Sequence, residues 1–343
     1  MKISARLRNL CAAALSLLCL AALPSCESIF EYEGDCSVNW RMNFRYDLNM
    51  KYADAFSHKT RNVTLYAFDQ SGALVWQNTV QGDTLSTEGY AMNLDLEPGV
   101  YDILAWAGCE EAAENFTIYP TKTDGLTCDD IYCEINRKYD DQGNAYVDSH
   151  LGTFMHGFVN DLEVVNEEGT HHVKMPMTKN TNEVYILLQN LSGEPMDKDD
   201  FTFTITDNNG RMAYDNSLLP CEEITYKAWR KASGTVGEDG VESRATITSA
   251  SVVVAELTIG RLVMGNDPRL NIINKAGELV LSIPLIDYAL LIKSHYDDMT
   301  DQEYLDRQDE YNMTFFLDED MHWVSSYIYI NSWKVVLSDV DFS

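Results

Sequence analysis

Apolar and polar residues alternate along much of the chain after residue 36. Between Val38 and Tyr46, every second residue is apolar and the residues between them are polar. A period of two is typical of a β-strand with one buried and one solvent-exposed face. Comparable runs recur at residues 63–68, 73–80, 92–96, 100–107, 184–191, 201–206, 245–257, 279–283, 313–317, 327–330 and 333–337. The pattern therefore predicts a mainly β protein.

Turn residues separate several of these runs. Glu97-Pro98-Gly99 favours a turn, because Pro fixes φ and Gly accepts positive φ. Asn209-Gly210 is typical of a hairpin, so we expect residues 201–206 to pair with residues 211–214. Several short strands with turn signals between them favour β-sandwiches.

One region of the second half, residues 285–310, has a helical pattern. Within it, Thr300 and Glu303 have the spacing of a capping box, in which two side chains bond backbone N–H groups at a helix start. We therefore expect a short helical insertion in the second half of the chain.

Residues 179–182 are polar and non-periodic, and they lie between two sets of alternating runs. We expect two tandem β-sandwich domains that fold independently, one at residues 36–177 and the other at 178–343. Residues 233–244 are rich in Gly, Ser and charge, and are expected to form an exposed loop.

The N-terminus has the layout of a secretory signal. Basic residues (Lys2, Arg6 and Arg8) precede an apolar stretch at residues 10–23, and Ser25 precedes Cys26. The apolar stretch is shorter than the roughly 20 residues that cross a bilayer. The layout resembles the lipobox of bacterial lipoproteins, which implies that residues 1–25 are removed and Cys26 carries the lipid. The alternative is a plain signal peptide followed by an ordinary free cysteine.

Residues 26–35 form an acidic linker after this cysteine. The linker is similar to the surface-export signal of Bacteroidetes lipoproteins, which implies a lipid-anchored protein of the outer membrane, exposed at the cell surface. The alternative is a solvated linker, since charged residues also make such segments.

Acidic residues outnumber basic ones by 54 to 25, and the formal net charge is -29. Removal of residues 1–25, which carry three basic residues and no acidic one, gives -32. This balance excludes nucleic acid as a partner, because its binding needs a basic surface. It also argues against adsorption of the protein to an anionic membrane, so we expect the lipid to provide the anchoring.

Eight cysteines are present, and five lie beyond the expected lipidation site. These are Cys36, Cys109, Cys128, Cys133 and Cys221. An oxidising compartment makes disulfides plausible, but an odd number leaves at least one thiol. The sequence leaves the connectivity open, although Cys128 and Cys133 could close a small loop.

Motifs that carry catalytic chemistry are absent from the sequence. It has no Gly-rich phosphate loop, no His-Glu-x-x-His and no Gly-x-Ser-x-Gly. Neighbouring acidic residues are interpreted as parts of turns and solvated faces, because a chain with so many acidic residues contains such pairs by chance. Residues 140–144 come closest to a calcium loop, but they lack its order of ligands. We therefore expect no enzymatic activity, catalytic residue, cofactor or metal.

Two further sets of residues have a structural and a functional interpretation. His171 and His172 are adjacent, so on a strand they face opposite sides and cannot easily share a metal. Trp side chains could stack on sugars, but the apolar strand patterns around them favour core or interface positions. The four considered are Trp40, Trp106, Trp323 and Trp333.

Several motifs together resemble a known family. They are Glu33-Gly34-Asp35-Cys36 before the first strand, residues 63–72, residues 94–101 followed by Ala105-Trp106-Ala107-Gly108, and residues 330–336. With the lipobox, their order and spacing resemble the FimB/Mfa-type fimbrial anchor family of Bacteroidetes. The likeness covers nearly the whole mature chain.

This resemblance implies two transthyretin-like β-sandwiches in a lipid-anchored accessory subunit. Such a subunit attaches a fimbria to the outer membrane and limits its length, with pilin subunits as its partners. Pilins of this system polymerise by strand exchange, in which backbone pairing supplies affinity. No long tail follows residues 335–337, so we expect this chain to accept a strand. The sequence identifies neither the fimbria, the contact surface nor a host ligand.

Two other classes of function stay open. A surface glycan-binding lipoprotein would be recognised by exposed Trp side chains. A secreted hydrolase would be recognised by a concave pocket with paired carboxylates.

Overall fold

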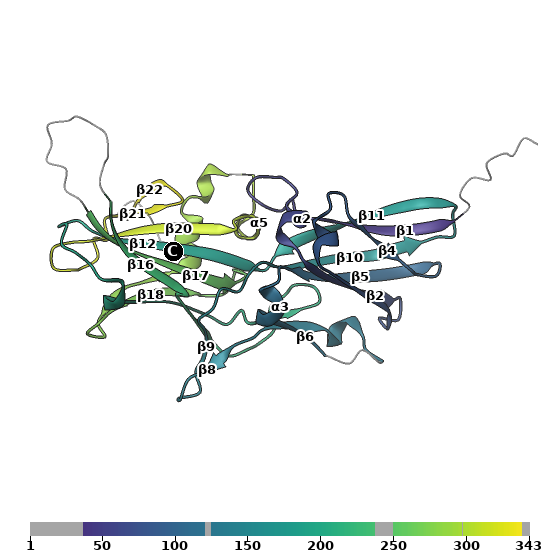
Figure 1. Cartoon of the computed structure of the whole chain (residues 1–343), viewed down its shortest axis with the longest axis horizontal. Coiled ribbons are helices and arrows are strands. Elements are labelled where there is room, and N and C mark those ends of the chain that lie inside the picture. Colours follow the sequence, from purple (N-terminus) through teal and green to yellow (C-terminus); the bar gives the residue numbers. More distant parts are fainter. Residues whose placement is uncertain (1–36, 121–124, 237–249, 297, 338–343) are drawn as a thin grey trace, which may run out of the picture.

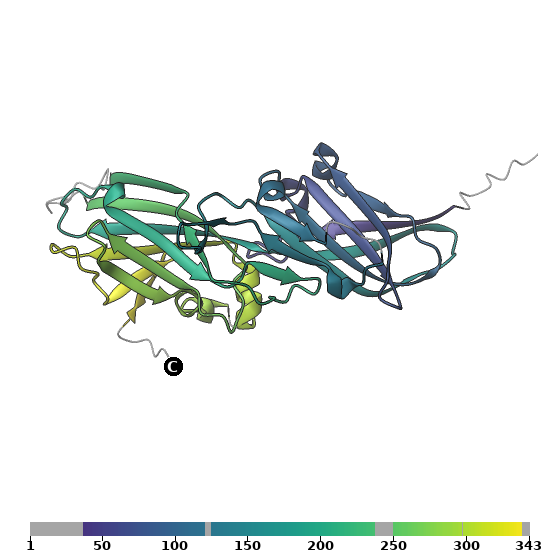
Figure 2. The same cartoon turned by 90° about the horizontal axis from the view of Figure 1, so that it is seen from below.

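The computed structural model describes residues 37–120, 125–236, 250–296 and 298–337. The predicted signal peptide (residues 1–25), the lipidation site Cys26, the acidic linker (26–35) and Cys36 lie outside these residues. Two lobes lie end to end along the longest axis, and the perpendicular view shows the same arrangement (Figures 1 and 2). The molecule is mainly β, as the alternating pattern predicts.

The N-terminal lobe is built on a seven-stranded sheet of order β3-β2-β5-β10-β11-β1-β4. Its strands are β1 (Val38–Arg45), β2 (Asn62–Asp69), β3 (Leu74–Gln81), β4 (Ala91–Leu94), β5 (Gly99–Gly108), β10 (Phe154–Val164) and β11 (Gly169–Lys179). The long strand β11 pairs in parallel with β1 through residues 169–176 and antiparallel with β10 through residues 177–179. The two parts of the sheet enclose one apolar core, which contains Met42, Leu65 and Ile103.

The C-terminal lobe contains two six-stranded sheets, ordered β16-β17-β12-β20-β21-β22 and β19-β18-β13-β15-β9-β8. Its strands are β12 (Thr181–Asn190), β13 (Phe201–Asp207), β15 (Ile224–Lys227), β16 (Arg230–Val236), β17 (Ala250–Gly260), β18 (Arg269–Asn274), β19 (Leu279–Pro284), β20 (Glu310–Leu317), β21 (Tyr327–Ile330) and β22 (Trp333–Val336). One apolar cluster includes residues of both sheets, among them Ile186 of β12 and Phe203 of β13. The same cluster continues into the N-terminal lobe through Trp106, so one core joins the lobes.

The helical insertion is present but shorter than residues 285–310. It consists of α4 (Leu285–Leu290), a 3₁₀ turn η4 (Lys293–His295) and α5 (Asp301–Arg307). The Thr300 hydroxyl accepts a hydrogen bond from the backbone N–H of Glu303 at 3.1 Å, which confirms the Thr300 half of the predicted capping box. The Glu303 carboxylate accepts a hydrogen bond from Arg307 at 2.8 Å. Strand β20 begins at Glu310, so the helical pattern ends before the predicted position.

Small elements fill the space beside and between the sheets. They are α2 (Phe56–Lys59), η1 (Asp83–Ser86), α3 (Ala112–Asn115), β6 (Phe116–Tyr119), η2 (Cys128–Asp130), β7 (Tyr132–Ile135), β8 (Lys138–Tyr139), β9 (Ala145–Val147), η3 (Lys198–Asp200) and β14 (Arg211–Ala213). Strands β14, β7 and β6 form a third, three-stranded sheet.

The prediction of a hairpin at Asn209-Gly210 is wrong. Strand β13 pairs with β15 and β18, whereas β14 pairs with β7 from the first half of the chain. Gly210 does not have positive φ; a Cβ there would lie 2.3 Å from the Cδ1 atom of Ile224, so the position needs glycine for close packing. Asn209 is buried and accepts a hydrogen bond from the hydroxyl of Tyr226 at 2.5 Å. Tertiary packing therefore overrides the local turn preference.

Strands from both sides of the expected domain boundary pair with one another. β7 pairs antiparallel with β14, and β9 pairs in parallel with β15. The segment that contains β7, β8 and β9 thus lies before residue 177 in the sequence. Its strands β7 and β9 nevertheless pair with strands that lie after residue 177. The division into domains at 36–177 and 178–343 stays a prediction.

Candidate functional site: exposed sheet edges and the joint between the lobes

Edge strands are the surfaces on which another chain can continue a sheet, because their outer backbone N–H and C=O groups are unpaired. Most edges in the described part of this protein are short. β4, β6 and β22 have four residues each, β14 has three and β8 has two. The longer edges are β3, β16 and β19, with eight, seven and six residues.

The two longest edge strands, β3 and β16, differ in charge. β16 begins with Arg230 and Lys231, and charged residues are a common protection of edge strands. β3 has the sequence Leu-Val-Trp-Gln-Asn-Thr-Val-Gln and carries no charge. Its Val75 side chain is 50% exposed, and the polar residues around it are mostly exposed. Of these two edges, β3 is therefore better suited to accept a strand, from Val75 onward, because the N–H of Leu74 already donates to the carbonyl of Leu126 at 2.9 Å.

Strand β3 is held firmly from its inner side. It pairs antiparallel with β2 from Leu74 to Gln81, and the hydroxyls of Thr64 and Thr79 lie 2.9 Å apart across the pair. Trp76 packs half-buried against the core of the N-terminal lobe. A rigid edge is a preorganised template, so less conformational entropy is lost when another strand adds to it.

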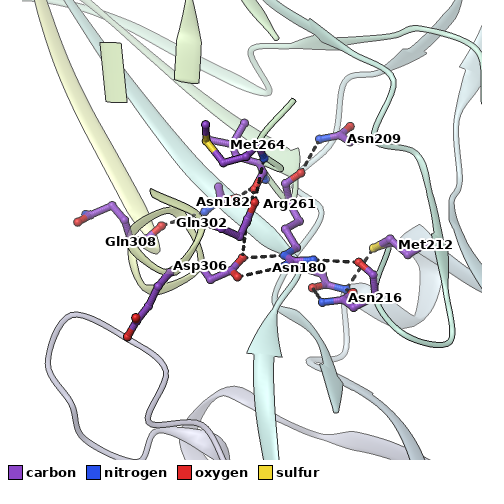
Figure 3. A network of polar contacts seen from close by, with 12 residues as sticks. Asn180, Asn182, Asn209, Met212, Asn216, Arg261, Met264, Gln302, Asp306 and Gln308 are labelled. Atoms are coloured by element: carbon purple, nitrogen blue, oxygen red, sulfur yellow. Dashed lines mark hydrogen bonds and ion pairs between the residues drawn. The ribbon is translucent and has the colours of Figure 1, made fainter. Parts of the chain in front are cut away.

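A buried polar network forms the joint between the lobes, and we call it the joint network (Figure 3). Its centre is the ion pair of Arg261 and Asp306, with two N–O distances of 2.7 and 2.8 Å and side chains only 14% and 10% exposed. Arg261 also donates to the carbonyl oxygen of Asn216 at 2.9 Å. Gln302 donates to Asp306 at 3.0 Å. The carboxylate therefore has partners on two sides, as a buried charge requires.

A pair of amide side chains extends the joint network toward the N-terminal lobe. Asn180 and Asn216 donate to each other's side-chain oxygens, at 2.6 and 3.1 Å, and both side chains are buried. Asn182 donates to the carbonyl of Gln308 at 2.9 Å. The polar residues at the expected domain boundary, 179–182, are thus buried, and Asn180 and Asn182 are hydrogen-bonded. They fix the turn from β11 into β12.

A second set of contacts lies beside the joint network. Lys179 is 4% exposed, and its Nζ atom is 3.8 Å from a carboxylate oxygen of Asp309. The hydroxyl of Tyr46 donates to the same carboxylate. Burial lowers the pKa of Lys179 and raises the pKa of Tyr46. The backbone carbonyl of Arg307 accepts from the N–H of Met50 at 3.1 Å, so the loop after β1 is bonded to α5.

The candidate glycan-binding tryptophans are mostly covered. Trp106 is 1% exposed and stacks on Phe154 with centroids 5.3 Å apart. Trp40 is half-buried and stacks on His171 at 4.6 Å. Trp323 is also half-buried, and Trp333, on the edge strand β22, is 46% exposed. The protein presents no row of exposed Trp side chains among the residues described.

Two of the three carboxylates in one cleft are held in the ionised form. This cleft of 420 Å³ is lined by Asp140, Glu222 and Glu223. Hydrogen bonds from Arg137 lower the pKa of Glu222 to about 2, and bonds from Asn144 lower that of Asp140. Both are ionised, so neither retains the proton that a general acid needs. Asp140 accepts from two backbone N–H groups of its own turn, which explains the resemblance to a calcium loop.

Other candidate positions have ordinary structural roles. In the part of the chain that the structure describes, Cys109, Cys128, Cys133 and Cys221 are all free thiols, so Cys128 and Cys133 do not close a loop. No group of three or more described His, Cys, Asp or Glu side chains is placed to hold a metal ion. None of the described helices is long and apolar enough to cross a membrane.

Neither the β3 edge nor the joint network is predicted by the sequence patterns. The absence of charge in residues 74–81 is a signal that could have indicated the edge. No sequence signal connects Arg261 with Asp306, because only the fold brings the residue after β17 next to α5.

Comparisons with known proteins agree with this architecture. The sequence matches the profile of the fimbrillin-A associated anchor proteins Mfa1 and Mfa2 over residues 32–339. No curated protein matches the sequence. A candidate adhesin from Bacteroides thetaiotaomicron is 33% identical, with a TM-score of 0.75, over 87% of this chain and 97% of that one.

Two further solved structures are similar. A candidate polysaccharide-binding protein from the same species is 28% identical, with a TM-score of 0.71, over 88% of this chain and 99% of that one. The fimbrial anchor protein Mfa2 from Porphyromonas gingivalis shares the fold, at 17% identity and a TM-score of 0.64, over 88% of this chain and 99% of that one. Because the family profile spans nearly all of the sequence, the chain belongs to the Mfa2 family of fimbrillin-A associated anchor proteins.

Proposed function

We propose that this protein is a lipid-anchored fimbrial anchor subunit of the outer membrane, tethered through Cys26, which holds a fimbria at the cell surface and limits its length. Membership of the anchor family carries this proposal, since that family consists of fimbrial structural proteins and not of enzymes. The signal-peptide layout before Cys26 supports the tether. One acyl chain binds a bilayer weakly and two or more bind it firmly, so lipidation would provide the anchoring.

Replacement of Cys26 by alanine tests the tether and the function together. We expect the variant protein to leave the membrane pellet, because no acyl chain remains to hold it. We also expect fimbriae to be shed into the medium and to be longer than normal. Cell fractionation and electron microscopy measure the two effects.

The matched control is Cys221→Ala, which removes a half-exposed free thiol of the C-terminal half of the chain. Variant protein that stays in the pellet would contradict lipidation at Cys26. Protein that leaves the pellet while fimbriae stay attached and of normal length would contradict the anchor role.

We further propose that the anchor accepts a strand from its pilin partner at the β3 edge. The support is the length of β3, its lack of charge and its firm attachment to β2. Such a contact would consist of backbone hydrogen bonds plus contacts of alternate side chains. It would therefore resist salt.

Val75→Lys combined with Gln77→Lys should weaken pilin binding at least tenfold, because added charges on an edge strand oppose pairing with another strand. The matched control is Leu279→Lys at the β19 edge, where the side chain is 61% exposed. Affinity for the purified pilin subunits measures the effect. Equal binding by the double variant and the control would show that the pilin binds elsewhere.

Glycan binding is the alternative function, favoured by the likeness to the candidate polysaccharide-binding protein. The described tryptophans favour it less, since only Trp333 is well exposed. If fimbriae stay attached without the anchor, glycan binding becomes the leading function.

A further inference from the structure

The outer face of strands β4, β1 and β11 is basic, although the protein is strongly acidic. Of the 54 acidic residues in the chain, none lies in these three strands. Met42, Phe44, Met175 and Met177 point into the core, so the alternate residues point outward. We call the outward face of β4, β1 and β11 the basic face. These strands form the upper layer of the N-terminal lobe in Figure 1.

The strand register places the basic side chains of this face in one group. Arg41 lies opposite His172, and Asn43 lies opposite Lys174, in the parallel pair of β1 and β11. Arg45 follows on β1, but it is paired with Asp47. Arg41 and Lys174 are exposed, and neither has an ion-pair partner among the residues described. Two cations without counterions are unusual in a protein with a twofold excess of acids.

A groove at one end of the basic face contains both basic and acidic side chains. It has a volume of 370 Å³, and Arg45, Lys174 and His58 line it together with the acids Asp54 and Glu88. The Asp54 carboxylate already accepts hydrogen bonds from the backbone N–H groups of Tyr46 and Phe56. Acids more than about 8 Å from Arg41 and Lys174 hardly weaken the charge of these two residues, because salt screens exposed charges beyond that distance.

We propose that the basic face binds the phosphate groups of anionic lipids in the outer membrane and lays the N-terminal lobe against the bilayer. This inference rests on the proposed lipid at Cys26. Eleven residues lie between Cys26 and Val38, so the start of β1 lies at most about 40 Å from the tether. β1 begins at the end of the lobe that points away from the joint. The tether therefore delivers this face to the membrane.

The electrostatic attraction between a few basic residues and an anionic bilayer can orient this protein but cannot anchor it. Each basic residue near an anionic bilayer contributes about 1 kcal/mol, a factor of about five. Two or three such residues cannot hold an acidic protein by themselves. A short tether keeps the face at millimolar effective concentration, where a small attraction is enough.

Acetylation of Lys174 measures the proposed contact. The mature chain, residues 27–343 with an N-terminal hexahistidine, is held by nickel-chelating lipid on vesicles of phosphatidylcholine or of equal phosphatidylcholine and phosphatidylglycerol. A water-soluble reagent then modifies exposed lysines, which mass spectrometry quantifies. We expect Lys174 to react at least fivefold more slowly on the anionic vesicles. Lys334, exposed on the other lobe, should react equally on both.

Variants and salt make the test specific. Arg41→Gln should reduce the protection of Lys174 about fivefold, and 0.5 M salt should abolish it, whereas the control Arg230→Gln should retain it. Equal reaction of Lys174 on both vesicles, or full protection in Arg41→Gln, would overturn the inference. Protection by dissolved polygalacturonate that equals or exceeds that by vesicles would assign the face to an acidic glycan instead. Because nickel provides the tether here, these results do not depend on whether Cys26 is lipidated.

Discussion

Replacement of Asp306 by alanine is expected to lower the free energy of unfolding by about 3–5 kcal/mol, as is typical when one partner of a buried ion pair is removed. The change leaves the Arg261 guanidinium 86% buried without its carboxylate. It also removes one of the two acceptors of the Gln302 side chain, which donates to Asp306 at 3.0 Å and to the carbonyl of Leu262 at 3.1 Å. Urea denaturation followed by circular dichroism measures the loss.

The matched control replaces both partners at once, as Arg261→Met with Asp306→Leu. Apolar side chains of similar volume in place of a buried ion pair are often neutral or stabilising. We therefore expect the double variant to be more stable than Asp306→Ala. If Asp306→Ala unfolds at the same urea concentration as the wild type, the ion pair does not stabilise the joint.

Division of the chain between residues 177 and 178 should prevent each part from folding alone. The C-terminal fragment loses β8 and β9, and the outer side of β15 then lacks its parallel partner. The N-terminal fragment loses β14, the partner of β7. Buried groups such as Trp106 and Phe203 belong to one apolar cluster that both fragments share, so each fragment would expose part of it.

Separate and mixed fragments distinguish the possibilities. We expect the native near-ultraviolet circular dichroism spectrum only when fragments 36–177 and 178–343 are mixed or coexpressed. The control is the intact mature chain under the same conditions. Native spectra from both separate fragments would show two independently folding domains, as the alternating pattern alone predicts.

Most strands, the start of α5 and the family can be predicted from the sequence alone. Strands with one buried face follow from a period of two, because successive side chains point to opposite sides of a sheet. Val38 to Tyr46 and residues 327–330 are therefore readable as strands without a structure. Thr300 marks the start of α5, since a hydroxyl can satisfy an N–H group that the helix leaves unbonded. Motifs before Gly108 and near Trp333 indicated the anchor family.

The pairing of the strands and the distribution of charged side chains over the surface depend on the tertiary structure. Asn209-Gly210 has the preference of a hairpin, but close contact with Ile224 and pairing of β14 with β7 override it. Net charge predicts an acidic surface, yet the register of β1 and β11 brings Arg41 and Lys174 onto one face without acids. Arg261 and Asp306 are 45 residues apart and form a buried ion pair. Contacts between distant residues depend on the global packing of the chain, which local periodicity and composition do not encode.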